Sequence, residues 1–212
     1  MSTTEPRAPS LNPSLAVGED GVARCAWVGT DAEYARYHDE EWGVPLHGDR
    51  AIFEKISLEG FQAGLSWISI LRRRPAFREL FYGFEPARVA QLGADDVERL
   101  MLDDRIIRNR AKIQATITNA ALTLELTSHA PGALDALVWS FAPPPSSRPR
   151  GLGDVPAHTA ESRALSAALR SLGFAFVGPI TMYALMQSGG LVDDHVEGCW
   201  RAIDPKPASG AG

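Results

Sequence analysis

Apolar residues recur at helical spacing along most of this 212-residue chain. The segment 49–63 begins with Asp49, a candidate helix cap. Its apolar positions follow a helical period: Ile52, Phe53, Ile56, Gly60 and Ala63. Further helices are predicted over the segments 65–81, 94–101, 108–127, 131–141, 159–174 and 179–187. Strand-like alternation of useful length and internal repeats are missing from the sequence, so the pattern predicts an all-α bundle of about eight to ten short helices.

Breaks in this pattern divide the chain. Residues 142–156 are rich in proline, glycine and serine and are predicted to form a surface loop. Residues 1–21 lack an apolar core behind a basic start, which favours a flexible leader over a secretory signal. We expect one helical domain over 22–203 and a loose tail over 204–212. No apolar run approaches the ~20 residues of a membrane span, so with no secretory signal we expect a cytoplasmic protein without a membrane partner. We also expect a monomer.

The charge of the chain bears on nucleic-acid binding. Its formal net charge of −5 argues against a non-specific nucleic-acid coat, because such surfaces are usually basic. Residues 71–78 and 105–112 are nevertheless dense in arginine and lysine. Such runs are usually solvated faces, but they also suit contact with DNA or RNA, and composition leaves both possibilities open.

A tight apolar turn, LGFAFVGP at 172–179, joins the last two predicted helices and carries Gly173 and Gly178. Pro179 suits the first turn of the following helix. Backbone N–H groups at a hairpin of this kind can bind a phosphate. The alternative is an ordinary helix–helix corner with a glycine cap.

The two cysteines of the chain each have a histidine at a spacing that suits metal binding. Twelve residues separate Cys25 from His38, and His195 lies four positions before Cys199, a helical spacing. Together they make a Cys2His2 set, a common structural zinc complement that leaves no open position for water. A disulfide is not expected in a reducing cytosol. The alternative is two small buried cysteines and two unrelated histidines.

Glu59 occupies an apolar position of the helical stripe in segment 49–63. Its carboxylate is therefore expected to face inward, where burial is costly without a partner. Trp67 follows after a bend, and Tyr37 directly precedes His38. Rings that stack and a carboxylate that accepts N–H bonds suit a flat, nitrogen-rich ligand. The alternative is a core glutamate bonded to a helix N-terminus.

Several ordered stretches of the chain carry a family resemblance. They are RCAWVGTDAEYARYHDEEWGVP, LEGFQAGLSWISIL, IIRNRAKIQA, LVWSF, and GFAFVGP followed by LVDDHVEGC. In these stretches the chain resembles the DNA-3-methyladenine glycosylase I family, from about Arg24 to Trp200. The resemblance implies a helix-hairpin-helix glycosylase fold with one structural Zn²⁺. It also implies a base-excision repair enzyme that flips 3-methyladenine out of alkylated double-stranded DNA and hydrolyses its N-glycosidic bond.

The resemblance assigns roles to residues of this chain. The implied zinc ligands are Cys25, His38, His195 and Cys199. The implied base pocket is Glu59 with Tyr37, Trp67, Trp27 and Trp42. The implied DNA contacts are Leu65, which enters the gap left by the extruded nucleotide, and the hairpin from Gly173 to Gly178. We add Arg108, Arg110 and Lys112 as expected phosphate contacts.

Two carboxylates are the candidate catalytic residues. Glu59 is expected to accept hydrogen bonds from the exocyclic amino group of adenine, where guanine presents an unfavourable carbonyl. Trp67 is expected to stack on the cationic ring of the methylated base. Asp193 stands where many members of the superfamily carry a catalytic aspartate that type I enzymes commonly lack. It is expected either to stabilise positive charge on the sugar or to cap the zinc-bearing helix.

Two other function classes fit part of this pattern. A non-catalytic DNA-binding module would keep the zinc ligands and the hairpin, but it has no use for the pair of Glu59 and Trp67. A zinc hydrolase would need a vacant coordination position, which four protein ligands close.

Overall fold

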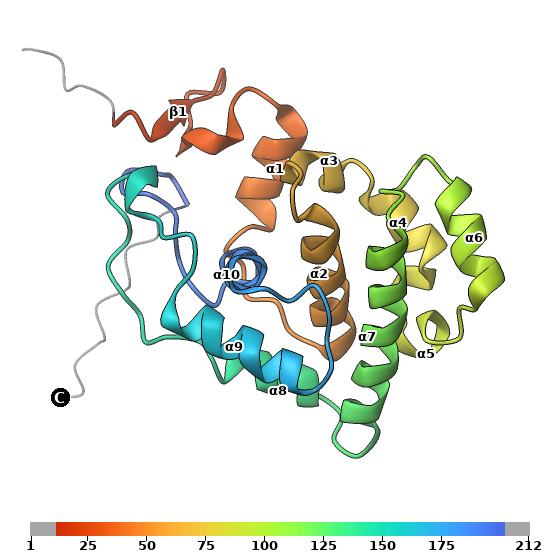
Figure 1. Cartoon of the computed structure of the whole chain (residues 1–212). Coiled ribbons are helices and arrows are strands. Elements are labelled where there is room, and N and C mark those ends of the chain that lie inside the picture. Colours follow the sequence, from red (N-terminus) through yellow and green to blue (C-terminus); the bar gives the residue numbers. More distant parts are fainter. Residues whose placement is uncertain (1–11, 202–212) are drawn as a thin grey trace, which may run out of the picture. The chain divides into compact units, whose positions relative to one another are not determined.

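The computed structural model describes residues 12–201, and most of them form helices (Figure 1). The α-helices are α1 (Ala32–Glu40), α2 (Asp49–Gln62), α3 (Trp67–Leu71), α4 (Arg74–Leu80), α5 (Pro86–Val89), α6 (Ala94–Leu102), α7 (Arg110–Ser128), α8 (Ala133–Trp139), α9 (Ala160–Ser171) and α10 (Pro179–Ser188). Short 3₁₀ turns are η1 (Ala26–Val28), η2 (Tyr82–Phe84) and η3 (Leu152–Asp154). Two strands, β1 (Leu15–Val17) and β2 (Ala23–Cys25), form an antiparallel pair. The predicted all-α class is confirmed, and the strands escaped prediction because three residues are too few to show alternation.

The described residues divide into two compact units, and the single helical domain over 22–203 stays a prediction. The first unit contains residues 12–41, 147–155 and 194–201, and the second contains 42–146 and 156–193. No described helix is long and apolar enough to cross a membrane.

The first unit joins segments that are far apart in the sequence. Leu15 of β1 pairs with Cys25 of β2, so ordered structure begins inside the predicted leader. The Trp200 N–H donates to the Ala23 carbonyl at 2.9 Å, which adds the C-terminal segment to this hairpin. Residues 1–11 of the leader and the predicted tail over 204–212 lie outside the described residues.

The central helix of the second unit is α2. Nine of its 14 residues are buried, and it contacts α7, α8 and α10. An aromatic cluster belongs to the same core, with neighbouring ring centroids 4.6–6.1 Å apart. It consists of Phe53, Phe61, Phe77, Phe81 and Phe84. Each buried phenyl ring contributes about 1.5–3 kcal/mol, so this packing fixes α2, the helix that carries Glu59.

Asp49 does not cap α2, contrary to the prediction. The N-cap of α2 is Gly48. The Asp49 carboxylate instead accepts N–H bonds from Gly132, Leu134 and Asp135 at 2.6, 2.9 and 3.0 Å. It thereby satisfies free N–H groups in the first turn of α8 and ties that helix to α2.

Candidate functional site

Glu59 is a buried carboxylate with two polar partners. Its side chain is 3% exposed, and its Oε1 lies 3.3 Å from Nζ of Lys55, one helical turn earlier on α2. The hydroxyl of Ser188, near the end of α10, lies 3.1 Å from the same oxygen. The inward orientation predicted from the apolar stripe is confirmed. Neither partner was predicted from the sequence, since serine and lysine are ordinarily surface residues.

The environment of Glu59 shifts its protonation. Burial disfavours the charged form and raises the pKa of the carboxyl above its usual value of 4.5. The positive charge of Lys55 opposes this rise most strongly, and the hydrogen bond from Ser188 opposes it further. The carboxylate is therefore held in a setting where a cation or an N–H donor is needed to stabilise its charge.

Trp67 brings an aromatic ring to the same place. It is the first residue of α3, after a turn in which Gly64 has a φ of 85°. Nζ of Lys55 lies 4.1 Å from the centroid of the Trp67 ring. Carboxylate, ammonium and indole thus form one cluster in the second unit, built from α2 and the start of α3.

The turn between α2 and α3 presents an apolar side chain to solvent. Leu65 is 42% exposed, and its carbonyl accepts a 2.7 Å hydrogen bond from the side-chain amide of Gln62. Nζ of Lys112 donates to the carbonyls of Phe61 and Ala63 at 2.9 and 2.8 Å. The ammonium of Lys112 therefore closes the C-terminal end of α2. This inward position is a correction to the expected phosphate contact, for which the ammonium would have to face outward.

A hairpin connects α9 to α10, as the sequence predicted (Figure 1). Gly173 has a φ of 95°, a conformation that favours glycine. Gly178 is the N-cap of α10, and Pro179 is its first residue. The Asn119 side chain of α7 clamps the turn, because it accepts from the Ala175 N–H at 2.9 Å and donates to the Ala175 carbonyl at 3.0 Å. Asn119 was missed by the sequence analysis, although a polar residue within a predicted helix could have signalled it.

The two exposed arginines that were predicted to contact phosphate lie at the start of α7. Arg110 is the first residue of α7, and Arg108 lies just before it. Arg110 forms a bidentate pair with Glu98 at 2.6 and 2.7 Å.

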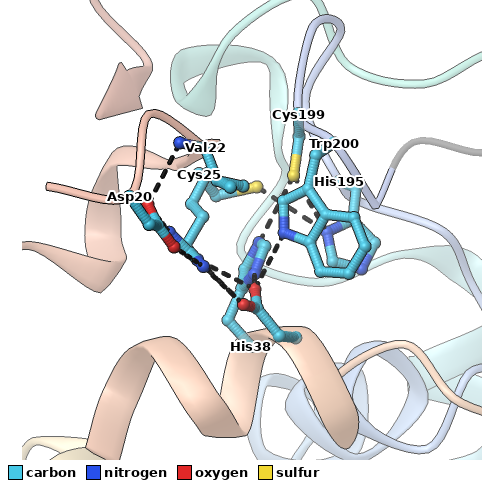
Figure 2. A network of polar contacts seen from close by, with 9 residues as sticks. Asp20, Val22, Cys25, His38, His195, Cys199 and Trp200 are labelled. Atoms are coloured by element: carbon cyan, nitrogen blue, oxygen red, sulfur yellow. Dashed lines mark hydrogen bonds and ion pairs between the residues drawn. The ribbon is translucent and has the colours of Figure 1, made fainter. Parts of the chain in front are cut away.

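The four predicted metal ligands converge in the first unit (Figure 2). Their candidate ligand atoms all lie within 4.8 Å of one another, and all four residues are buried. Sγ of Cys199 lies 3.4 Å from Nε2 of His38 and 3.6 Å from Nδ1 of His195. Sγ of Cys25 lies 3.8 Å from the same nitrogen of His195. The cluster is a buried donor set that could hold a metal ion.

The segment that carries two of these residues is not a helix. His195 and Cys199 lie in a turn region after α10, where Gly198 has a φ of 89°. The helical spacing was therefore misleading, and Asp193 has no metal-bearing helix to cap. Asp193 is exposed in the loop after α10, in the second unit.

Asp39 contacts His38, one of the four candidate metal ligands. Its Oδ1 lies 2.8 Å from Nδ1 of His38, which leaves Nε2 of that ring directed at Cys199. Arg24 and the indole N–H of Trp200 also donate to Asp39. Burial tends to raise the pKa of Asp39, but the hydrogen bonds from Arg24, His38 and Trp200 outweigh it, so the pKa is lowered. A carboxylate that orients a ligating imidazole is typical of metal sites.

The two thiols of the cluster influence each other. A hydrogen bond from Cys25 lowers the pKa of Cys199, and the imidazoles of His195 and His38 lower it further. The same bond to Cys199, followed by burial, raises the pKa of Cys25. Both shifts arise from the close approach of the two sulfur atoms, which suits a cluster whose ligands act as thiolates.

The remaining predicted pocket residues are distributed between the units. Tyr37 is buried on α1, and Trp27 of η1 lies edge-on to His38 with ring centroids 5.3 Å apart. Both belong to the first unit. Trp42 belongs to the second unit, with Glu59 and Trp67. Their proposed contacts with a base remain predictions.

Comparison with known proteins places this chain among alkylation-repair enzymes. The model of the methyladenine glycosylase family matches residues 27–202. DNA-3-methyladenine glycosylase 1 of Escherichia coli (strain K12) is 47% identical over 180 residues, which cover 84% of this chain and 96% of that protein. A DNA-3-methyladenine glycosylase of Haemophilus influenzae is 44% identical over 84% of this chain and 97% of its own length.

Solved structures agree with these relatives. A crystal structure of 3-methyladenine DNA glycosylase I is 46% identical with a TM-score of 0.80, covering 84% of this chain and 98% of that one. A Staphylococcus aureus structure concerned with 3-methyladenine recognition is 34% identical, also with a TM-score of 0.80, over 85% and 97% of the two chains. Because the family model matches most of the chain and these relatives share its sequence and fold, the chain belongs to the methyladenine glycosylase family.

Proposed function

We propose that this protein removes 3-methyladenine from alkylated double-stranded DNA by hydrolysing the N-glycosidic bond. The observation that carries the proposal is Glu59, a carboxylate enclosed beside the indole of Trp67 and already paired with a cation. Relatives of this protein carry the name DNA-3-methyladenine glycosylase. A duplex-bound base cannot reach a buried group, so the nucleotide is flipped out at a cost of a few kcal/mol.

Recognition of the base rests on charge and hydrogen-bonding pattern. A methyl group on N3 gives the base in DNA a positive charge, which the Glu59 carboxylate attracts. Trp67 stacks on the cationic ring, an interaction of about 1–2 kcal/mol when desolvated. The exocyclic amino group of adenine donates to Glu59, whereas guanine offers a carbonyl at that position and is disfavoured. Trp42, which belongs to the same unit as Glu59 and Trp67, adds to the aromatic lining in this proposal.

The chemical step needs little acid catalysis, because the cationic base is already a good leaving group. The bond between C1′ and the base breaks, and its electron pair neutralises the base. Water then adds to C1′ and loses a proton. In this proposal Glu59 holds the base in place, and Asp193, exposed after α10, stabilises the positive charge that develops on the sugar.

DNA docking uses exposed groups around the pocket. Leu65, which is 42% exposed, fills the gap left by the flipped nucleotide. Amides of the hairpin from Gly173 to Gly178, together with Arg108 and Arg110, bind phosphates. Neutralisation of Z phosphates gives a slope of about −0.9Z in a plot of log affinity against log salt.

The donor set of the first unit suits a structural Zn²⁺. Zinc bonds of about 2.3 Å to sulfur and about 2.0–2.1 Å to nitrogen, at the tetrahedral angle, place S and N ligands about 3.6 Å apart. The observed S···N distances of 3.4, 3.6 and 3.8 Å match this value. Cys25, His38, His195 and Cys199 would hold the ion, which supplies folding energy and no open coordination position for chemistry.

The proposal is tested by base release from methylated DNA. Wild-type protein is expected to liberate 3-methyladenine, detected by chromatography. Trp67→Ala removes the stacking surface and is expected to lower kcat/KM about tenfold or more, as the loss of 1–2 kcal/mol implies. Trp67→Phe keeps an aromatic face and should retain more activity than Trp67→Ala. Absence of 3-methyladenine release by the wild type would refute the proposed function.

A further inference from the structure

Lys55 is a nearly buried cation that the proposed mechanism leaves without a role. Its side chain is 11% exposed. Nζ lies 3.3 Å from Oε1 of Glu59 and 4.1 Å from the centroid of the Trp67 ring. A lysine on a central helix could extend its ammonium to water, as most lysines do. Here the ammonium is held against the two groups that the proposed function gives to the base.

The position of this ammonium is the position that a cationic base requires. A positively charged ring bound by Glu59 would lie against the carboxylate and the face of Trp67. Nζ of Lys55 makes both of these interactions within the protein. Two cations sharing one buried carboxylate and one ring face would repel each other, so the ammonium and the base exclude each other.

We propose that the ammonium of Lys55 competes with the base for Glu59 and Trp67. The cationic substrate displaces the ammonium from these two groups, and the ammonium displaces the neutral product from them. This inference rests on the proposed function. It assigns Lys55 to product release, a step that the residues of the pocket do not otherwise explain.

The charge change during the reaction gives the competition its direction. Before cleavage the base carries a positive charge, so it can replace the charge of the Lys55 ammonium beside Glu59. When the bond to C1′ breaks, its electron pair passes to the base, which becomes neutral. Water adds to C1′ and releases one proton, so atoms and charge balance. The neutral base now offers Glu59 only a hydrogen bond, whereas Lys55 offers a full charge, and the ammonium displaces the product.

The test measures binding of free, neutral 3-methyladenine to the protein without DNA, by quenching of tryptophan fluorescence. Lys55→Met removes the charge and keeps the length of the side chain. It is expected to tighten the Kd for the neutral base about tenfold, which corresponds to about 1.4 kcal/mol. Lys55→Gln should shift the Kd in the same direction, and thermal unfolding followed by circular dichroism checks that each variant is folded.

A control is provided by another cation that pairs with a carboxylate of α2. Arg78 pairs with Glu54 of α2 at 2.7 Å, so Arg78→Met also removes a cation from an α2 carboxylate, and it should leave the Kd unchanged. An unchanged or weakened Kd in folded Lys55→Met and Lys55→Gln would overturn the role of Lys55. If the wild type still releases 3-methyladenine from methylated DNA in that case, the proposed function stands. If the wild type does not release it, the proposed function fails on its own test.

Discussion

The hydroxyl oxygen of Ser188 lies 3.1 Å from Oε1 of Glu59 and 2.6 Å from the carbonyl oxygen of Ala184. A hydroxyl group has one proton, so Ser188 donates to only one of these acceptors at a time. The carboxylate therefore depends more on the charge of Lys55 than on Ser188. This matches the larger effect of Lys55 in holding down the pKa of Glu59.

Ser188→Ala is accordingly expected to have a modest effect. Loss of one hydrogen bond should lower the free energy of unfolding by about 1 kcal/mol, measured by urea denaturation, and should lower kcat/KM less than tenfold. Ser57→Ala is the matched control, because the Ser57 hydroxyl on α2 is also buried and donates to the Phe53 carbonyl at 2.8 Å. Ser57→Ala should change stability similarly and leave kcat/KM unchanged. Equal losses of activity in the two variants would contradict a link between Ser188 and Glu59.

The pH dependence of excision should report the protonation of Glu59. Base recognition requires the carboxylate, and its pKa lies above 4.5 because of burial. The acid limb of kcat/KM against pH is therefore expected to have its midpoint above pH 4.5. Lys55→Met should move the midpoint to higher pH, since Lys55 is the main group that favours the ionised form. A wild-type midpoint at or below 4.5 would exclude the buried carboxylate as the titrating group.

The same shift has a defined sign for stability. The folded state binds the Glu59 proton more tightly than the unfolded chain does, so the stability contribution of Glu59 is greatest below pH 4.5 and is lost as pH rises through the folded pKa. The difference in unfolding free energy between wild type and Glu59→Gln should therefore decrease as pH rises through the folded pKa of Glu59.

Asp39→Asn tests the support of the metal cluster. Asp39 accepts from His38, and loss of such a partner typically weakens metal binding about 10–100-fold. Competition with a chromogenic chelator measures the zinc affinity. Asp20→Asn is the control, because Asp20 pairs with Arg24 at 2.7 Å as Asp39 does. The hydrogen bonds of Asp20 involve Arg24 and Val22, and not one of the candidate metal ligands. Equal zinc affinities in the two variants would argue against the orienting role of Asp39.

Leu65→Ala tests whether Leu65 acts in the flipping step and not in folding. Leu65 is 42% exposed, so its truncation should change the unfolding free energy by no more than about 0.5 kcal/mol. Excision from duplex DNA should fall, while binding of free 3-methyladenine should not change. Leu102→Ala, at an 82% exposed leucine on α6, is expected to alter neither property. Wild-type excision by Leu65→Ala would remove this residue from the flipping step.

Sequence periodicity predicted the helices and the inward direction of Glu59, because both depend on which face of a helix is apolar. It could not identify Lys55 as a second inward group, since lysine is ordinarily exposed and interrupts an apolar stripe. Spacing paired the cysteines with the histidines correctly, yet it wrongly placed His195 and Cys199 on a helix. Four positions can also be spanned by a turn, which Gly198 provides with a φ of 89°.

Contacts between distant segments were beyond the reach of local patterns. The capping of α8 by Asp49 and the clamp of the hairpin by Asn119 join residues 83 and 56 positions apart. The contact of Asp39 with His38 is likewise supported by hydrogen bonds from Arg24 and Trp200, which approach Asp39 only in the folded first unit. Polar residues of this kind are recognised once the fold shows which buried groups they satisfy.

In the proposed function the buried carboxylate of Glu59 selects 3-methyladenine, and one comparison of variants tests this selection most directly. Release of 3-methyladenine from methylated duplex DNA is measured for wild type, Glu59→Gln and Glu54→Gln. Glu54 lies on the same helix and pairs with Arg78, so it controls for the loss of an α2 carboxylate. We expect a drop of at least about tenfold in kcat/KM for Glu59→Gln, the loss of one charge-assisted hydrogen bond, and wild-type activity for Glu54→Gln. Wild-type kcat/KM for a folded Glu59→Gln variant would contradict the selection of 3-methyladenine by Glu59.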